Sequence, residues 1–320
     1  MIDLENEIDR LRRTCINCGK FSAVCPSLKH GGFDPKEMMV AGIGDINLCI
    51  QCGKCSQVCS RTDPFRVMRD CLALYKDQHP NETYQSYRFI LPPAEDCLEP
   101  GWDGDDVCVI PGCVVESRLP YLKHACRVAL DSIGKKSHQI SDNQCCLMPS
   151  MFSELGDMGR RPVRSMMMRG EKGALVTLCG GCANEFQHDG AGVRHILQYL
   201  FENIDSLPVS PKSYKVAIEP GCSMDLHYKE MKAVVEKMGF TIVNKTYGCC
   251  GSKKPPLDRM LEERENECVE ADFIVLNCPY CMTKYERYEG GKPCMHIVEL
   301  VAFAAGDSAT LGLHNIPFRS

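Results

Sequence analysis

Three cysteine groups decide how this sequence is interpreted: PGC at residues 220–222, GCCG at 248–251 and CPYC at 278–281. Each group follows a short apolar run. The same order occurs earlier, as PGC at 111–113, QCC at 144–146 and CGGC at 179–182. An internal repeat of this kind is the first feature to establish in a sequence. We call the two groups of five the first cysteine set, Cys113, Cys145, Cys146, Cys179 and Cys182, and the second cysteine set, Cys222, Cys249, Cys250, Cys278 and Cys281.

The spacing within each set predicts the fold. The first set has 31 residues between its single cysteine and its adjacent pair and 32 between that pair and its CxxC group, whereas the second set has 26 and 27. Each gap is long enough for a helix and a strand, so the cysteine groups would follow successive strands of a parallel βαβαβ unit. The thiols of one set should then converge at the edge where open α/β sheets bind ligands.

Composition limits the class of protein. With 320 residues the chain has room for two or three domains, and its net charge of −5 without a long basic run argues against a nucleic-acid partner. No apolar stretch approaches the ~20 residues that span a bilayer, and the charged start MIDLENEIDRLRR predicts a short helix and not a signal peptide. The 23 cysteines therefore favour metal binding in a reducing cytoplasm over a secreted disulfide framework.

A second cysteine pattern lies near the N-terminus. The run CIQCGKCSQVCS has the CxxCxxCxxxC spacing of a bacterial-type ferredoxin, in which the fourth cysteine of one run ligates the cluster of the other. A tetrahedral zinc site is the alternative, but it needs two separate pairs, and the partner run carries the CP of Cys25 and Pro26. We therefore expect one complete cubane [4Fe-4S] cluster, with ligands Cys25, Cys49, Cys52 and Cys55.

The other N-terminal cluster lacks a ligand. Its expected thiols are Cys15, Cys18 and Cys59, but Phe21 stands where the third cysteine of the first run belongs. The site would hold a three-iron cluster, a four-iron cluster with a non-cysteine ligand, or no stable cluster. Cys71 lies in a helical pattern and is interpreted as an ordinary buried thiol.

The expected organisation is a multidomain α+β and α/β protein. A helical bacterial-type ferredoxin domain with a linker would span residues 1–100, and two repeated Rossmann-like βαβαβ domains would span 101–211 and 212–320. Acids at 103, 105 and 106 are interpreted as a solvated turn, with docking to a partner as the alternative. The cysteines outside every motif are interpreted as core or linker thiols: Cys97, Cys108, Cys126, Cys268 and Cys294.

Five thiols per set indicate what the sets bind. Five thiolates exceed the four ligands of a tetrahedral zinc ion, and adjacent cysteines point in different directions, which suits a centre with several metal atoms. The residues alone therefore predict two thiolate-bound iron–sulfur centres.

These motifs resemble a known enzyme family. The PGC, CC and CxxC sets are similar to the CCG domains of the B-type subunits of heterodisulfide reductase, and the N-terminal runs resemble the ferredoxin-like C-type subunits of that enzyme. Their order resembles the fused D-type subunit of the membrane-associated enzyme, and the likeness extends to the tail LGLHNIP at 311–317. Two departures are CCLMP in place of CCG in the first set and SKKPP after the CCG of the second.

The resemblance implies that each cysteine set holds a noncubane [4Fe-4S] cluster. It also implies that the coenzyme M–coenzyme B disulfide of methanogenic archaea binds between the two clusters, with electrons relayed singly from the N-terminal clusters. Lys253 and Lys254 would stand beside a cluster loop and attract the anionic substrate, whereas the alternative makes them solvated surface lysines or a partner contact.

The sequence alone is also compatible with two other functions. The chain would be the iron–sulfur subunit of a glycolate-, glycerol-phosphate- or fumarate-type oxidoreductase complex, or an electron carrier or assembly module without a substrate of its own. GIGD at residues 42–45 is too short for a dinucleotide fingerprint, so a partner must donate electrons. We expect either an A-type flavoprotein of the reductase family or a membrane cytochrome b, through which a cytoplasmic protein would associate with the membrane.

Overall fold

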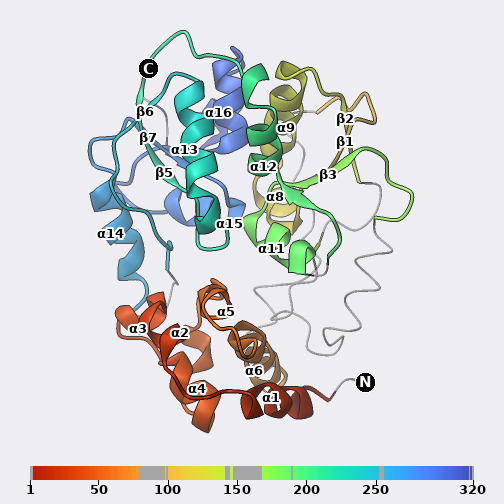
Figure 1. Cartoon of the computed structure of the whole chain (residues 1–320). Helices are drawn as coiled ribbons and strands as arrows, with labels where there is room; N and C mark the ends of the chain where they lie inside the picture. The colour runs from red at the N-terminus through yellow and green to blue at the C-terminus, as the bar shows by residue number, and fades with distance from the viewer. Residues whose placement is uncertain are drawn as a thin grey trace. The chain divides into compact units, whose positions relative to one another are not determined.

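The computed structural model describes residues 3–78, 98, 100–140, 145–146, 168–188, 190–251, 256–316 and 318, apart from the side chains of residues 76, 77 and 188. These residues form two compact units. The first contains the described residues up to 78 together with 251 and 256–262, and the second contains the others. Figure 1 shows the elements of both units, and each unit is described by itself. The expected division into three domains stays a prediction.

The first unit is helical. Its N-terminal helix begins at Asp3, whose carboxylate accepts from the backbone N–H of Asn6 at 3.2 Å, and it buries Leu4, Ile8 and Leu11 on one face as the sequence predicted. The elements up to residue 78 are α1 (Leu4–Arg13), α2 (Lys20–Ala23), α3 (Pro26–Lys29), α4 (Pro35–Ala41), η1 (Ile46–Leu48), α5 (Lys54–Gln57) and α6 (Pro64–Gln78).

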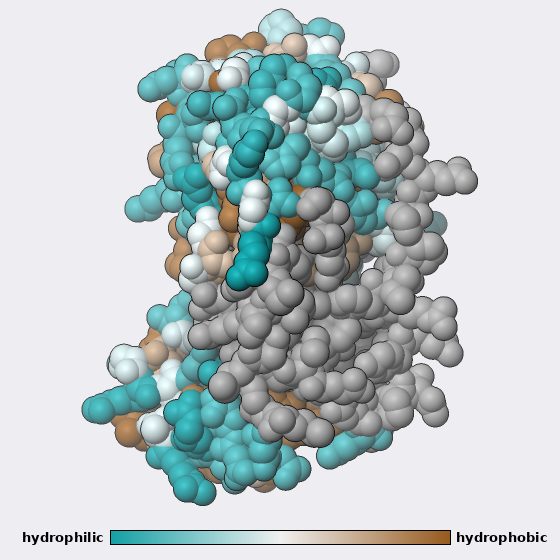
Figure 2. All heavy atoms as spheres, turned by 90° about the vertical axis from the view of Figure 1, so that its right-hand side faces the viewer, coloured by the Kyte–Doolittle hydropathy of each residue, from teal (hydrophilic) through white to brown (hydrophobic). Residues whose placement is uncertain are grey.

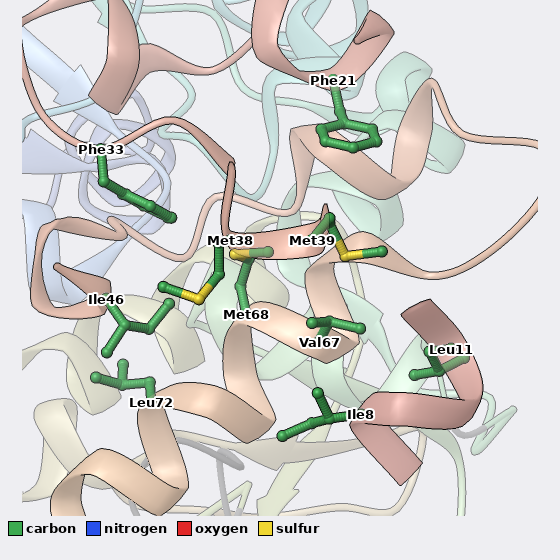
Figure 3. Packing of buried hydrophobic residues seen from close by; sticks show 10 residues of the cluster. All are labelled: Ile8, Leu11, Phe21, Phe33, Met38, Met39, Ile46, Val67, Met68 and Leu72. Carbon is green, nitrogen blue, oxygen red and sulfur yellow. The ribbon is translucent and has the colours of Figure 1, made fainter. Parts of the chain in front are cut away.

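A hydrophobic core holds these short helices together (Figure 3). Because helices of one or two turns are not stable alone, their packing supplies most of their stability. Cys15, Cys49 and Cys55 lie against this core and are partly buried. The buried members of the core are Ile8, Leu11, Phe21, Phe33, Met38, Met39, Ile46, Val67, Met68 and Leu72.

The two N-terminal cysteine loops have the same backbone conformation. Asn17 in the first loop and Gln51 in the second both have a φ of 55°, and the glycines two residues later, Gly19 and Gly53, have φ of 72° and 75°. Each glycine begins a four-residue helix, α2 or α5. The two N-terminal cysteine runs therefore share one local structure.

The second unit contains two parallel sheets, in the orders β2-β1-β3-β4 and β6-β5-β7-β8. The parallel strands confirm the expected mixed α/β class, and the two sheets share one strand order. The first half comprises β1 (Val107–Ile110), α8 (Cys113–Arg118), α9 (Tyr121–Ser132), β2 (Ser137–Gln139), β3 (Ala174–Thr177), α11 (Gly180–His188), β4 (Arg194–His195), α12 (Ile196–Glu202) and η3 (Ile204–Ser206).

The second half repeats this order with small changes. It comprises β5 (Lys215–Glu219), η4 (Asp225–His227), α13 (Tyr228–Lys237), β6 (Thr241–Ile242), α14 (Arg259–Glu267), β7 (Phe273–Leu276), α15 (Pro279–Tyr285), β8 (Cys294–His296), α16 (Ile297–Ala304) and η5 (Leu311–Leu313). The sequence predicted three strands per sheet, and the structure adds a fourth to each, β4 and β8. These strands have two and three residues, which is too short for a detectable periodicity.

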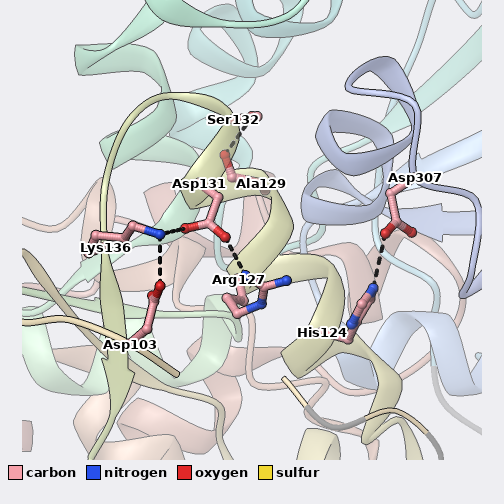
Figure 4. A network of polar contacts seen from close by, with 8 residues as sticks. All are labelled: Asp103, His124, Arg127, Ala129, Asp131, Ser132, Lys136 and Asp307. Atoms are coloured by element: carbon pink, nitrogen blue, oxygen red, sulfur yellow. Dashed lines mark hydrogen bonds and ion pairs between the residues drawn. The ribbon is translucent and has the colours of Figure 1, made fainter. Parts of the chain in front are cut away.

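Polar contacts join the two halves of the second unit. His124 on α9 pairs with Asp307, which follows α16, at 3.1 Å (Figure 4). His314 in the C-terminal tail lies between two carboxylates, with Nδ1 2.7 Å from Glu286 and Nε2 2.9 Å from Glu299. Glu286 also accepts from the hydroxyl of Tyr121 on α9 at 3.0 Å. The tail and α9 are thus fixed to the same glutamate.

The acidic turn before β1 is held by lysines and is not only solvated. Lys136 donates to Asp103 at 2.7 Å and to Asp131 at 3.4 Å (Figure 4), and Lys172 pairs with Asp105 at 3.1 Å.

No helix among the described residues is long and apolar enough to cross a bilayer. The described residues on the face shown in Figure 2 are mostly hydrophilic, with hydrophobic ones scattered between them.

Candidate metal centres

Loops after the strands bring the cysteine groups together. Cys113 begins α8 directly after the PG turn that follows β1, and Gly112 in that turn has a φ of 88°. A Cβ on Gly112 would lie 3.3 Å from Sγ of Cys182, and a Cβ on the corresponding Gly221 would lie 3.7 Å from Sγ of Cys281. Both glycines therefore allow the single-cysteine loop to approach the CxxC loop of its own set.

Each thiol of the first cysteine set contacts a neighbouring thiol of that set. Cys113 makes a hydrogen-bond contact with Cys145, and Cys146 contacts both Cys145 and Cys182. Cys182 in turn contacts Cys179. The five thiols from three loops are thus linked through their neighbours.

The second cysteine set has the same arrangement. Cys249 contacts Cys222 and Cys250, and the sulfur of Cys250 lies 3.3 Å from that of Cys281. Cys281 also contacts Cys278. The order of contacts from single cysteine to adjacent pair to CxxC group is the same in both sets.

The two sets meet at their CxxC groups. The thiols of Cys179 and Cys278 are neighbours: contact with Cys182 and with Cys278 lowers the pKa of Cys179, and contact with Cys179 raises that of Cys278. The two sets therefore join in one continuous chain of neighbouring thiols. Contact with Cys146 and burial raise the pKa of Cys182, whereas hydrogen bonds from Cys145 and Cys182 lower the pKa of Cys146 to about 6. Thiolates this close repel one another unless cations lie among them.

The donor set fits multinuclear centres. Each set offers five sulfurs from three loops, one more than a tetrahedral ion accepts, and six of the ten cysteines are buried. Thiolate sulfur is the ligand of iron–sulfur clusters. Each set would therefore hold one cluster, with Cys179 and Cys278 at the boundary between them.

Two buried histidines fix this boundary. His195 ends β4 and His296 ends β8, both are fully buried, and their ring centroids are 6.1 Å apart. Nε2 of His195 lies 2.9 Å from the carbonyl oxygen of Asn277 and 3.2 Å from that of Leu178. Nε2 of His296 lies 3.0 Å from the same oxygen of Leu178 and also bonds Asn277. Leu178 and Asn277 immediately precede the first cysteines of the two CxxC groups.

The histidine tautomers follow from the helices that they begin. The backbone N–H of Leu197 donates to Nδ1 of His195 at 3.1 Å, and that of Val298 donates to Nδ1 of His296 at 3.4 Å. Nδ1 is therefore an acceptor, and Nε2 carries the proton that the carbonyls accept. Burial lowers the pKa of His195 to about 3 and also lowers that of His296, so both rings are neutral at neutral pH.

A buried glutamate holds the CCG loop of the second set. Glu219 accepts from the backbone N–H of Gly248 at 3.0 Å and from Nε of Arg264 at 3.0 Å. Arg264 also donates to the carbonyl oxygen of Thr246 at 3.0 Å. Burial raises the pKa of Glu219 to about 7 although Arg264 opposes this shift. The corresponding residue of the first half is Ile110, which has no carboxylate and so cannot make this clamp.

Opposite charges stand beside the two sets. Lys284 and Glu185 each lie three residues after the last cysteine of their set, and both are buried. The charge of Lys284 acts to lower the pKa of Cys250, whereas that of Glu185 acts to raise the pKa of Cys146. Two otherwise similar sites therefore have different electrostatic surroundings.

The first unit has a cavity at the predicted cubane site. All four expected ligands, Cys25, Cys49, Cys52 and Cys55, line one pocket that is open to solvent. Burial raises the pKa of Cys25. The backbone N–H groups of Leu28 and Ser27 donate to its sulfur and act to lower that pKa. The site thus provides four thiols and space between them, which fits a cluster.

The second N-terminal site, which lacks one cysteine ligand, differs from the predicted cubane site. Cys15 lies against the hydrophobic core, Cys18 is exposed and Cys59 is partly exposed. Phe21 is 1% exposed and points into the core (Figure 3). A hydrophobic side chain therefore occupies the ligand position, and the cluster type at this site stays a prediction.

Some expected residues lie outside the described part of the chain, namely Lys253, Lys254 and Cys97. Conversely, sequence reasoning missed His195, His296, Glu185 and Lys284. A signal existed, because RHILQYL at 194–200 and MHIVELV at 295–301 place a histidine before an apolar helix in corresponding positions of the repeat.

The sequence of this chain is similar to those of two known enzyme subunits. It is 24% identical over 267 residues to the B-type subunit of the ferredoxin/F420H2-dependent CoB–CoM heterodisulfide reductase of Methanosarcina acetivorans, and equally to that of the ferredoxin:CoB–CoM heterodisulfide reductase of Methanosarcina mazei. Each match covers 62% of this chain and 88% of the relative. No protein-family profile matches the chain. The relatives are oxidoreductase subunits, and the similarity supports a relationship to disulfide-reductase iron–sulfur subunits.

Proposed function

We propose that this protein is the iron–sulfur catalytic subunit of a disulfide reductase, with the CoM–CoB heterodisulfide as its substrate. The observation that carries the proposal is the meeting of two five-thiol sets at Cys179 and Cys278. A disulfide needs two electrons and two protons to become two thiols. Two neighbouring redox centres meet that requirement when each handles one sulfur of the substrate.

The protein supplies position and environment. Bound clusters would supply one-electron transfer and iron for the substrate sulfurs at the ten cysteines. His195 and His296 hold the backbone carbonyls before Cys179 and Cys278, which fixes the distance between the two sites. Burial of the surrounding side chains keeps water away and strengthens each charge there.

The charges make the two sites unequal. Lys284 favours added negative charge at the second set and Glu185 opposes it at the first, so the electron would rest more stably at the second set. This difference would direct the substrate in one orientation. The attraction of the anionic coenzymes by Lys253 and Lys254 remains part of the proposal.

Electrons would enter through the first unit. The cubane expected on Cys25, Cys49, Cys52 and Cys55 passes one electron at a time, and a partner of the flavoprotein or cytochrome b type would reduce it. The arrangement of C-type and B-type parts in one chain belongs to this proposal. The second candidate is a pure electron carrier, which the same cavity also favours.

Anaerobic purification and assay with a reduced dye test the proposal. We expect heterodisulfide-dependent dye oxidation together with a paramagnetic signal that forms when free coenzyme M is added under oxidising conditions. Substituting Cys278→Ala should abolish both effects, whereas Cys126→Ala, a buried thiol outside the sets, should preserve them. Dye oxidation without any heterodisulfide dependence would leave only the carrier function.

A further inference from the structure

A second kind of metal-binding geometry lies on the first sheet, apart from both cysteine sets. Cys108 on β1 and His138 on β2 are direct neighbours in the parallel strand register. Glu171 precedes β3, and its Oε2 lies 3.6 Å from Sγ of Cys108 and 3.0 Å from Nε2 of His138. One ligand atom from each residue lies within 4.8 Å of the others. A thiol, an imidazole and a carboxylate thus face a common point.

A glycine allows this approach. Gly173 has a φ of 78°, and a Cβ there would lie 2.4 Å from the carbonyl oxygens of both Asp105 and Asp106. Only glycine permits the turn before β3 to press against the chain before β1. That close contact carries Glu171 over the pair on β1 and β2.

The distances match the edges of a tetrahedral zinc site. Zinc binds sulfur at ~2.3 Å and nitrogen or oxygen at ~2.0–2.1 Å, which places two ligand atoms of one tetrahedron about 3.3–3.6 Å apart. The separations of 3.6 and 3.0 Å in the structure lie at and slightly below this range. The combination of borderline and soft donors also favours zinc over magnesium or calcium.

The orientation of the imidazole agrees with metal binding. Nδ1 of His138 lies 3.1 Å from the carbonyl oxygen of Gly104, so Nδ1 is the donor. Metal-ligating histidines commonly use their second nitrogen in this way. In a neutral ring with this tautomer, Nε2 has a lone pair directed at the carboxylate oxygen of Glu171, so a proton or a metal ion must lie between them.

A protonated His138 paired with Glu171 is the simpler alternative. It explains the 3.0 Å contact between Nε2 and Oε2, but it leaves the buried sulfur of Cys108 beside the same carboxylate oxygen with only a weak S–H donor between them. A zinc ion satisfies all three donors together. Lys172 does not compete for the site, because its ammonium group pairs with Asp105 at 3.1 Å.

We propose that Cys108, His138 and Glu171 bind one zinc ion, with water as the fourth ligand. It would join the edge strand β2 to β1 and to the turn before β3. Cys108 precedes Cys113 by five residues along a strand and its loop, a separation of up to about 16 Å. The inference therefore goes beyond the proposed reductase function and does not depend on it.

Metal analysis of the anaerobically purified full-length protein tests the proposal. We expect about one zinc per chain in the wild type and in Cys126→Ala, a matched buried thiol on α9. Cys108→Ala and Glu171→Gln should lose the zinc with their iron content unchanged. Glu171→Gln keeps the shape of the side chain, so it remains informative if Cys108→Ala fails to fold.

A cobalt titration and a chelator experiment complete the test. Zinc-depleted wild type should bind Co²⁺ with thiolate-to-cobalt absorption, and Glu171→Gln should bind it at least tenfold more weakly. A chelator should lower the melting temperature of the wild type and not that of Glu171→Gln. Equal zinc and cobalt binding in wild type and Glu171→Gln, or no binding in either, would overturn the proposal in favour of the His138–Glu171 ion pair.

Discussion

Replacing the two buried histidines by asparagine tests how the cysteine sets are held together. Asparagine caps a helix well, so His195→Asn and His296→Asn preserve the helix starts but are too short to reach the carbonyls of Leu178 and Asn277. Each carbonyl is bonded by both rings. Each single substitution therefore leaves every carbonyl with one donor. We expect each substitution to lower the free energy of unfolding by about 1 kcal/mol.

The double variant removes both donors from two buried carbonyls. An unsatisfied buried carbonyl costs ~1–3 kcal/mol, so the double variant should lose at least ~1 kcal/mol more than the sum of the single variants. Urea unfolding measures this coupling, and the rate of iron release to a chelator should rise in parallel because the loops of Cys179 and Cys278 loosen. Strictly additive losses with unchanged iron release would refute the shared bridge.

Three further predictions concern charge and metal content. Removing the positive charge by Lys284→Gln should lower the reduction potential of the second-set cluster by on the order of 50 mV, and Glu185→Gln should raise that of the first, as measured by potentiometric titration of the paramagnetic signals. For His314, burial alone would lower the pKa, but the charges of Glu299 and Glu286 raise it to about 9. Its stabilisation of about 3 kcal/mol is therefore complete below pH ~6.5 and is lost as the pH rises through ~9, so the melting temperatures of wild type and His314→Gln should converge over that range. Finally, Cys25→Ala should lower the iron content by about four atoms per chain, and equal iron in variant and wild type would exclude the cavity as a cluster site.

Much of the site could be predicted from the repeat. The apolar runs before Cys113, Cys179, Cys222 and Cys278 do form parallel strands, because buried strands are continuous hydrophobic segments that the sequence displays directly. Convergence of each set followed from that topology. Cys25, Cys49, Cys52 and Cys55, which the ferredoxin spacing groups together, also line one pocket.

The contacts between the two repeats could not be predicted in the same way. The meeting of Cys179 with Cys278 depends on how two sheets pack, and no local pattern encodes that packing. The contact of Cys108 with Glu171 could not be predicted either, because the two residues are 63 positions apart in the sequence. The sequence places Glu185 and Lys284 at matching positions of the repeat, but only the structure shows that both charges are buried.

Iron and acid-labile sulfide analysis of the anaerobically purified protein tests the central claim most directly. The account predicts about eight iron atoms on the two cysteine sets in addition to those of the first unit, and a loss of about four in Cys250→Ala. Cys268→Ala, a buried thiol outside the sets, should retain all of them. Iron content of about four atoms or fewer in the wild type, with the same content in Cys250→Ala, would contradict the assignment of clusters to the two sets.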